Sequence, residues 1–296
     1  MTLPTPTALS ASAHPAAPVS PATPVDGPAD ASSGPLGRTS AIAWALAIRD
    51  LRSRYTRSQL GAILTVLQPV LWLTTAVLAF WFLMGAGHDR DNTHSWITYA
   101  ARTAAALAAW LPIAECWGRA PSAFQAQAPL IRRTRFPFLA IPLALVAAAG
   151  VTGMISFVLA LVLLPFAGGA EPLTLTSAAA AGMGLTLLWA AAGAVALSAV
   201  GVFFRDLTSL IGHFLTLGML ITPIYYDPSI VPPAYQWAIQ LNPLAAPANL
   251  LRTAAGSTPP QSVWLCGLYS AALGVLVLWV GLALLKRLAA KIPEQL

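Results

Sequence analysis

The sequence predicts an all-α integral membrane protein: six transmembrane helices preceded by an amphipathic interfacial helix, with short re-entrant helices between spans five and six. Composition is one reason, because 57% of the 296 residues are apolar and only 9% are charged, against about a quarter in soluble chains. Hydropathy is the other. A helix needs roughly 20 apolar residues to cross the hydrocarbon core. The segments that meet this requirement are 61–84, 95–117, 138–166, 175–203, 207–226 and 262–285.

The distribution of positive charge predicts the orientation of the chain. Twelve of its sixteen Lys and Arg residues form four groups beside the predicted spans. These groups are Arg49/Arg52/Arg54/Arg57, Arg119/Arg132/Arg133/Arg135, Arg205 and Lys286/Arg287/Lys291. Positive charge beside spans stays on the cytoplasmic side, so we expect a multi-pass protein of the bacterial inner (cytoplasmic) membrane with both termini cytoplasmic. The net charge of +6 then indicates membrane lipids as partners, and no nucleic acid.

The N-terminal segments lie outside the spans. Residues 1–40 are mostly Pro, Ala, Ser and Thr, and they predict a disordered cytosolic tail because they cannot bury enough apolar surface to fold. Residues 41–58 predict an amphipathic helix. Its apolar stripe consists of Trp44, Ile48, Leu51 and Tyr55, with arginines on the other faces. Such a stripe fits a helix in the membrane interface, and burial against neighbouring protein is a compatible alternative.

Residues 59–290 form the predicted six-span membrane domain, and residues 291–296 a cytosolic C-terminus. Gln68-Pro69 predicts a bend in the first span, with the amide facing a protein cavity rather than lipid. Spans three and four are rich in Ala and Gly, which indicates close helix packing. The outer region 227–260 is broken by five prolines between Asp227 and Asn249, and it predicts two short helices that dip into or lie on the outer leaflet.

Catalysis within this chain is not expected. A phosphate-binding loop needs Gly followed by Lys and Ser/Thr, but the chain's two lysines, Lys286 and Lys291, do not follow glycine. The carboxylates lie apart, except for Asp89 and Asp91, which flank Arg90 in a short outer hairpin. The histidines have no spacing typical of metal ligands. We therefore expect no cofactor or metal in this chain, and a membrane-embedded glycosyltransferase is an unfavoured alternative.

If the chain transports a substrate without its own energy source, it must be driven from outside itself. Two cytosolic segments could receive a soluble partner: residues 118–135, predicted as one helix parallel to the membrane, and the tight turn at 203–209. Either could also be an ordinary connector. Their position on the same side as the basic amphipathic helix favours a docking surface.

Several stretches resemble the ABC-2 type permeases that export polysaccharides, most closely the O-antigen and teichoic-acid exporters. They are RDLRSRYTRSQLGAILTVLQPVLWL at 49–73, PLIRRTRFPFLAIPLA at 129–144, FFRDL at 203–207 and ITPIYYDPSIVPPAYQWAIQLNPLAAPANLLR at 221–252. The resemblance covers about residues 41–290, with the stretches in the same order. The chain departs from the family in its long N-terminal tail, in an Arg-rich stretch where Lys is common, and at Asp227, for which the resemblance implies no role.

The resemblance implies two copies of the chain and two separate ABC ATPase subunits, which bind ATP and Mg. It also implies a polysaccharide on an undecaprenyl pyrophosphate carrier, with an ABC-2 permease for a small amphipathic drug or lipid as the alternative. The docking surface it implies comprises Arg119, Phe124, Gln125, Leu130, Arg132, Arg133, Arg205 and Asp206.

Two groups of residues are candidates for substrate contact. Sugars stack well on aromatic rings, and the first and fifth predicted spans carry Trp72, Phe80, Trp81, Phe214, Tyr225 and Tyr226. Membrane-interface belts use the same residue types, so these side chains could serve either purpose. The interfacial helix carries Arg49, Arg52, Arg54, Tyr55 and Arg57. Guanidinium groups bind phosphate oxygens bidentately, so this set could meet a lipid pyrophosphate or act as simple membrane anchors.

Overall fold

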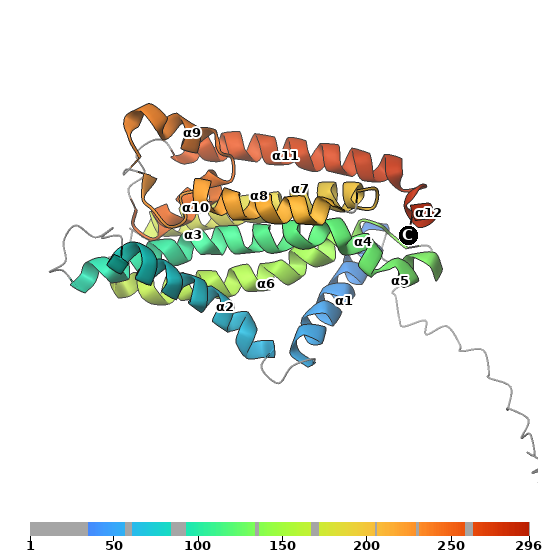
Figure 1. Ribbon diagram of the computed structural model, residues 1–296, viewed down its shortest axis with the longest axis horizontal. Coiled ribbons are helices and arrows are strands. Elements are labelled where there is room, and N and C mark those ends of the chain that lie inside the picture. The colour runs from blue at the N-terminus through green and yellow to red at the C-terminus, as the bar shows by residue number, and fades with distance from the viewer. Residues whose placement is uncertain are drawn as a thin grey trace, which may run out of the picture.

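The computed structural model describes residues 35–56, 61–83, 93–133, 136–166, 172–204, 206–228, 231–257 and 263–295. Within these ranges the chain is helical and contains no strand. Five helices run side by side along the long axis (Figure 1): α3 (Thr93–Arg119), α6 (Ala140–Leu163, continued by the 3-10 helix η3, Leu164–Phe166), α7 (Pro172–Gly201), α8 (Leu207–Ile221) and α11 (Val263–Leu288). The sixth, α2 (Gly61–Ala76), continues as the π-helix η1 (Val77–Leu83) and crosses the others at an incline.

These helices coincide with the six apolar segments, so the all-α prediction is confirmed for the described part of the chain. By length and composition, three are able to cross a membrane: Ala140–Leu163, Thr174–Gly201 and Val263–Leu288. Leu67–Phe80 and Leu207–Ile221 are apolar but shorter. At 1.5 Å per residue, α8 is only about 22 Å long, against a hydrocarbon core of about 30 Å. Six spans therefore stay a prediction.

Small residues hold the centre of the bundle together, as the Ala/Gly-rich sequence indicates. The central helix α7 packs against α3, α6 and α11. At Gly193 of α7, a Cβ would collide with the indole of Trp117 in α3, whose Nε1 donates a hydrogen bond to the carbonyl oxygen of Trp189 (2.9 Å). A larger residue at position 193 would displace that indole.

The N-terminal helix α1 extends from Pro35 to Thr56 and lies obliquely to the bundle (Figure 1). It begins six residues before the predicted boundary, so residues 35–40 are helical and not part of a disordered tail. Proline is well suited to the first helical turn, where its missing N–H is not needed. Ala43 and Ala47 are buried where α1 packs on α6, whereas Trp44 is exposed. Part of the predicted apolar stripe therefore faces away from the protein.

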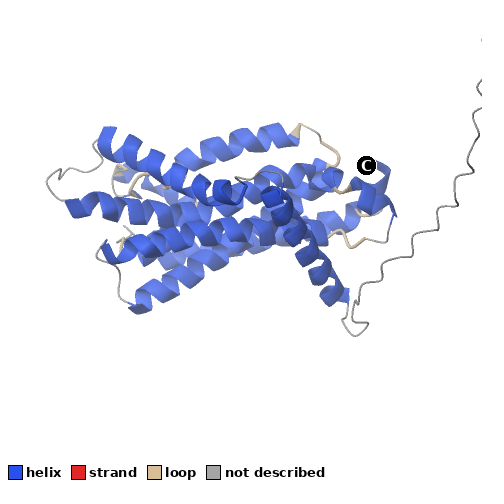
Figure 2. Ribbon diagram, turned by 90° about the horizontal axis from the view of Figure 1, so that it is seen from below, coloured by secondary structure: helices blue, strands red, loops and turns tan. Residues whose placement is uncertain are grey.

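The segment after α3 is not one helix, as predicted, but three short pieces: the 3-10 helix η2 (Ala120–Ser122), α4 (Ala123–Ala126) and α5 (Ala128–Arg133). Pro121 and Pro129 favour the breaks, because proline removes a backbone hydrogen bond of the preceding turn and bends or interrupts a helix. The segment lies at the same end of the molecule as α12 (Ile292–Gln295) (Figure 1). Figure 2, seen from below, shows that the described connections between helices are short.

The opposite end carries the 3-10 helix η5 (Pro233–Tyr235), α9 (Gln236–Leu241) and α10 (Ala245–Ala254) (Figure 1). The two short helices predicted between positions 227 and 260 are therefore present. Most of α10 is buried, against α7 and α3. It is thus part of the packed core, while the depth of this region in a membrane stays a prediction.

Candidate functional site

An open cavity of about 650 Å³, here called the groove, lies along the side of the bundle. Its walls come from α1, α2, α3, α6 and α8. The lining residues are Asp50, Gln68, Trp72, Trp110, Leu111, Ala114, Glu115, Arg119, Thr152, Leu215, Thr216 and Met219. Gln68, which lies next to Pro69 inside α2, lines this groove, and the orientation of its amide away from lipid stays a prediction. Trp110, Thr216 and Met219 belong to the groove although the sequence did not single them out.

A polar network closes one end of the groove. Arg119 of α3 makes a bidentate contact with Asp50 of α1, from Nη2 to Oδ1 at 2.7 Å and from Nη1 to Oδ2 at 2.9 Å. Its Nη1 also lies 3.4 Å from Glu115 Oε1, and Thr152 of α6 donates a hydrogen bond to Glu115 Oε2 at 2.8 Å. The network ties α1, α3 and α6 together. Its charged members among the described side chains are two carboxylates and one guanidinium.

The predicted aromatic residues fall into different environments. Trp72 lines the groove and is 39% exposed, and Phe214 is exposed on α8 while stacking on Trp117 with ring centroids 6.1 Å apart. Phe80 stacks on Tyr225 at 5.0 Å. Tyr225 is buried, and its ring packs the stretch after α8 against Phe80 of η1, so its place on the path wall stays a prediction.

Two further predicted aromatic residues lie elsewhere. The hydroxyl of Tyr226 donates a hydrogen bond to the carbonyl oxygen of Ile221 (2.8 Å), which holds its ring over the end of α8. Trp81 belongs to η1, but its side chain lies outside the described part of the structure. Trp72 and Phe214 therefore remain the best candidates for contact with a passing substrate.

The predicted interfacial arginines lie near the same end as the polar network. Arg49 donates a hydrogen bond from Nη2 to Gln127 Oε1 at 2.6 Å, which joins α1 to the linker between α4 and α5, and Arg52 is exposed. Arg54 and Tyr55 belong to α1, but their side chains are not described. Arg57 lies outside the described residues. A pyrophosphate site here stays a prediction.

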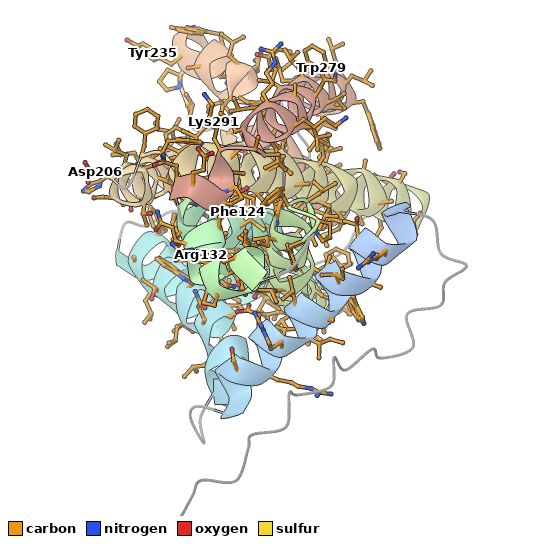
Figure 3. The ribbon with its side chains drawn as sticks, turned by 90° about the vertical axis from the view of Figure 1, so that its right-hand side faces the viewer. Phe124, Arg132, Asp206, Tyr235, Trp279 and Lys291 are labelled. Carbon is orange, nitrogen blue, oxygen red and sulfur yellow. The ribbon has the colours of Figure 1, made fainter. Side chains whose placement is uncertain are left out.

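Of the predicted docking residues, Phe124, Arg132 and Asp206 lie at the end of the molecule that faces the viewer in Figure 3. Gln125, Arg132 and Asp206 are exposed and Leu130 is half-buried. The side chain of Arg133 is not described, and Arg205 lies outside the described residues. Two assignments change. Phe124 is fully buried and packs edge-on against Phe138 at 6.0 Å, so it supports the surface from beneath rather than lying on it. Arg119 is engaged with Asp50.

A buried arginine that the sequence did not single out holds the opposite end of the bundle. Arg252 of α10 is 3% exposed. Its Nη1 donates to the carbonyl oxygens of Pro223, Ile224 and Tyr226 at 3.3, 3.4 and 3.1 Å. Its Nη2 lies 3.5 Å from Asp227 Oδ2. Burial lowers the pKa of Arg252, and the charge of Asp227 opposes that shift. Asp227 therefore has a role in this chain, as the counter-ion of Arg252.

Comparison with known proteins gives one family and several relatives. Residues 42–255 match the family described as ABC-2 type transporter. The O-antigen export system permease protein RfbA of Myxococcus xanthus is 29% identical over 203 residues, which cover 67% of this chain and 74% of the relative. A protein of the same name from Klebsiella pneumoniae is 26% identical over 210 residues, which cover 67% and 73%.

Proposed function

The chain belongs to the ABC-2 type transporter family, and we propose that it is the transmembrane subunit of a polysaccharide exporter. Its substrate would be a lipid-linked glycan such as O-antigen or teichoic acid, carried on undecaprenyl pyrophosphate across the bacterial inner membrane. The names of the two relatives support a polymer rather than a small amphipathic drug or lipid. In this proposal α2 with η1, α3, α6, α7, α8 and α11 are the six spans, with both termini in the cytoplasm.

The groove carries the proposal. Gln68, Glu115 and Thr216 line it at positions inside predicted spans, where polar groups facing lipid are costly. They are compatible with a water-filled path instead. One wall is α8, which has no buried residue, so it lacks the cover that the other long helices receive. A second copy placed against α2 and α8 would close two grooves into one path wide enough for a sugar chain.

Energy would come from two separate ABC ATPase subunits, which bind ATP and Mg. Their proposed docking surface is the exposed part of the segment from Gln125 to Arg133, together with the turn at Asp206. This segment is linked to the groove's polar end through α1, because Gln127 accepts a hydrogen bond from Arg49 and the neighbouring Asp50 pairs with Arg119. Movement of the docking segment would therefore reach the groove through these contacts.

The first test is genetic and biochemical. Deleting the chain should abolish the surface polysaccharide, and the purified chain should associate with its ATPase. Normal surface polymer together with a loss of drug resistance would contradict the proposal and favour a drug permease. Replacing Arg132 and Arg133 with Glu should then reduce partner-dependent ATP hydrolysis. The matched control is Lys286→Glu with Arg287→Glu, which makes the same charge change at the same end of the molecule.

The second test addresses the assembly. Leu217 is exposed on α8 and Val275 on α11. In a Cys266→Ser background, Leu217→Cys should form a disulfide between two copies in the membrane, whereas Val275→Cys should not. Equal cross-linking at both positions, or at Val275→Cys alone, would contradict a closure of the path by α8.

A further inference from the structure

A second cavity, distinct from the groove, lies between α9, α10 and the first turn of α11. Here it is called the carboxamide pocket, because the polar side chains that line it include Gln236, Gln240 and Asn249. It has a volume of about 40 Å³ and lies at the end of the bundle opposite the docking segment (Figure 1). This is the end that the proposed orientation places outside the cell membrane.

The walls of the pocket are held in place without any ligand. Asn242 caps the start of α10, since its Oδ1 accepts a hydrogen bond from Leu244 N at 3.0 Å while its Nδ2 donates to Thr222 Oγ1 at 3.1 Å. Ser270 of α11 donates a hydrogen bond to the carbonyl oxygen of Pro243 (2.7 Å) and accepts one from Trp189 Nε1 (2.9 Å). These contacts anchor the α9–α10 corner to α8, α11 and α7.

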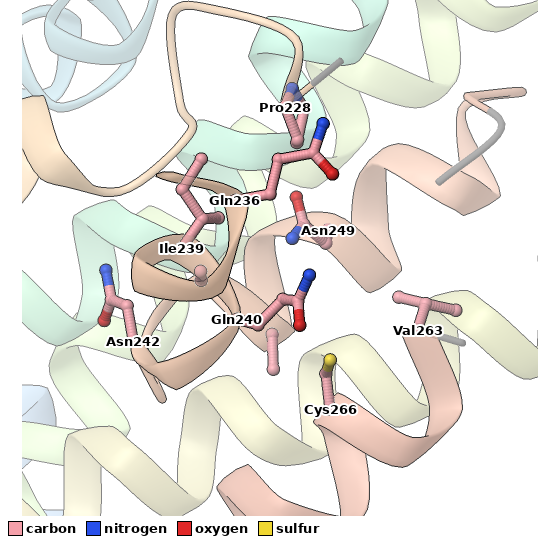
Figure 4. Close-up of a pocket in the computed structure, with 10 residues that line it drawn as sticks. Pro228, Gln236, Ile239, Gln240, Asn242, Asn249, Val263 and Cys266 are labelled. Carbon is pink, nitrogen blue, oxygen red and sulfur yellow. The ribbon is translucent and has the colours of Figure 1, made fainter. Parts of the chain in front are cut away.

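Three carboxamide side chains in the pocket have polar atoms that form no hydrogen bond with the described residues. The Nε2 of Gln236 donates a hydrogen bond to the carbonyl oxygen of Val231 at 3.1 Å, which leaves its Oε1 available. The side chains of Gln240 and Asn249 make no hydrogen bond within the part of the chain that the structure describes. Figure 4 shows the three amides next to one another along the pocket, while Asn242 lies apart.

The lining determines the chemistry of the ligand. The ten lining residues include no Asp, Glu, Lys, Arg or His, so a charged group would enter without a counter-ion, which is unfavourable. A carboxamide offers both donors and acceptors, and hydroxyl groups also do both. The volume suits a few water-sized groups, such as a hydroxymethyl arm with a neighbouring hydroxyl, and is too small for a whole pyranose ring.

We propose that the carboxamide pocket binds the hydroxyl-bearing edge of an uncharged sugar residue at the outer surface, and that this residue belongs to the emerging polymer. The identity of the ligand rests on the proposed function, whereas its hydroxyl chemistry rests on the pocket. The pocket would give the chain a contact with the polymer at the exit, separate from the aromatic side chains of the groove. The glycerol headgroup of phosphatidylglycerol has the same chemistry and is the competing source of such a group.

The test uses the complete permease–ATPase complex in phosphatidylcholine nanodiscs, titrated with oligosaccharides released by mild acid from the cell's own surface polymer. Gln240→Leu and Asn249→Leu should each raise the Kd at least fivefold, about the effect of one lost hydrogen bond. Asn249→Ser, which keeps a hydroxyl, should have a smaller effect, and the exposed Gln295→Leu should have none. Thermal unfolding of each variant identifies any that fails to fold.

The outcomes separate this inference from the proposed function. An unchanged Kd in folded Gln240→Leu and Asn249→Leu overturns the pocket, even if deletion of the chain abolishes the surface polymer. A normal surface polymer after deletion overturns the proposed function itself. A further comparison uses nanodiscs that contain phosphatidylglycerol. If this lipid stabilises the wild type but not the two leucine variants, and those variants still bind the oligosaccharide normally, then the pocket binds lipid and the polymer assignment is overturned.

Discussion

Replacing Arg252 with Met should destabilise the end of the bundle that carries α9 and α10. Methionine keeps the unbranched apolar stem of the arginine side chain. It removes the donor to three backbone carbonyls and the partner of Asp227. Leaving a buried backbone carbonyl without its donor costs about 1–3 kcal/mol. The three carbonyls share one Nη1 at long distances, 3.1–3.4 Å, so the total lies well below three times that cost. We expect a loss of about 3 kcal/mol.

Asp227→Asn should have a much smaller effect. The asparagine oxygen can still accept from Arg252, and a partly exposed ion pair contributes at most about 1 kcal/mol. Arg252→Lys should behave like the Met variant rather than the wild type, because a single ammonium cannot replace the planar fork of donors. The carbonyl oxygens of residues 223–226 therefore account for most of the predicted loss.

The assay is thermal unfolding of the purified chain in detergent, measured as the amount of protein that remains monodisperse on heating. On a scale of about 2–4 °C per kcal/mol for a chain of this size, Arg252→Met should lower the Tm by roughly 6–12 °C. Asp227→Asn should lower it by no more than about 4 °C on the same scale. Equal shifts for the two variants would refute the reasoning, because they would assign the stabilisation to the ion pair and not to the carbonyls.

Three other predictions concern the groove and its surroundings. Gly201→Ala should destabilise the chain by about 2 kcal/mol and weaken binding of the ATPase, since a Cβ there would collide with the backbone of Pro121; normal ATPase binding measured by co-purification would contradict this. Trp72→Ala should leave the Tm within about 2 °C of the wild type, because the side chain is 39% exposed, but reduce export of surface polymer several-fold on immunoblots; an unchanged blot would remove Trp72 from the path. Asp50→Asn should lower stability by no more than about 1 kcal/mol, since its pair with Arg119 is partly exposed, yet reduce transport-coupled ATP hydrolysis; hydrolysis and export at wild-type levels would show that this contact transmits nothing.

The sequence predicts the helices of this chain well because their positions depend on local properties. Length and hydropathy are sufficient to find each long helix, and the Ala- and Gly-rich composition of α7 is enough to predict its close packing at positions such as Gly193. Proline also acts locally, but the prediction of one continuous helix underestimated its effect. Pro121 and Pro129 divide the segment after α3 into short pieces, although its amphipathic pattern suggests one continuous helix.

Side-chain partners could not be predicted in the same way, because they are separated along the chain. Asp50 and Arg119 are 69 residues apart, and Asp227 and Arg252 are 25 apart. Each contact exists only after the helices have packed. A charged residue next to a predicted span therefore has the same sequence signature whether it anchors the chain to lipid or ties two helices together. Burial distinguishes the two roles, and it assigns Arg252 to the second.

The same distinction changes how the docking end can work. The resemblance assigns Arg119 and Phe124 to contact with a partner, but Arg119 bonds Asp50 and Phe124 packs on Phe138 beneath the surface. Both side chains lie just before the segment from Gln125 to Arg133, and they hold the part of the chain that leads into it. Since Arg119 also lines the groove, a displacement of the segment that pulled on the end of α3 would strain a contact that forms the groove's own wall. Coupling between an ATPase and the groove would then require no long chain of intermediates, only the loss or exchange of the Asp50–Arg119 pair.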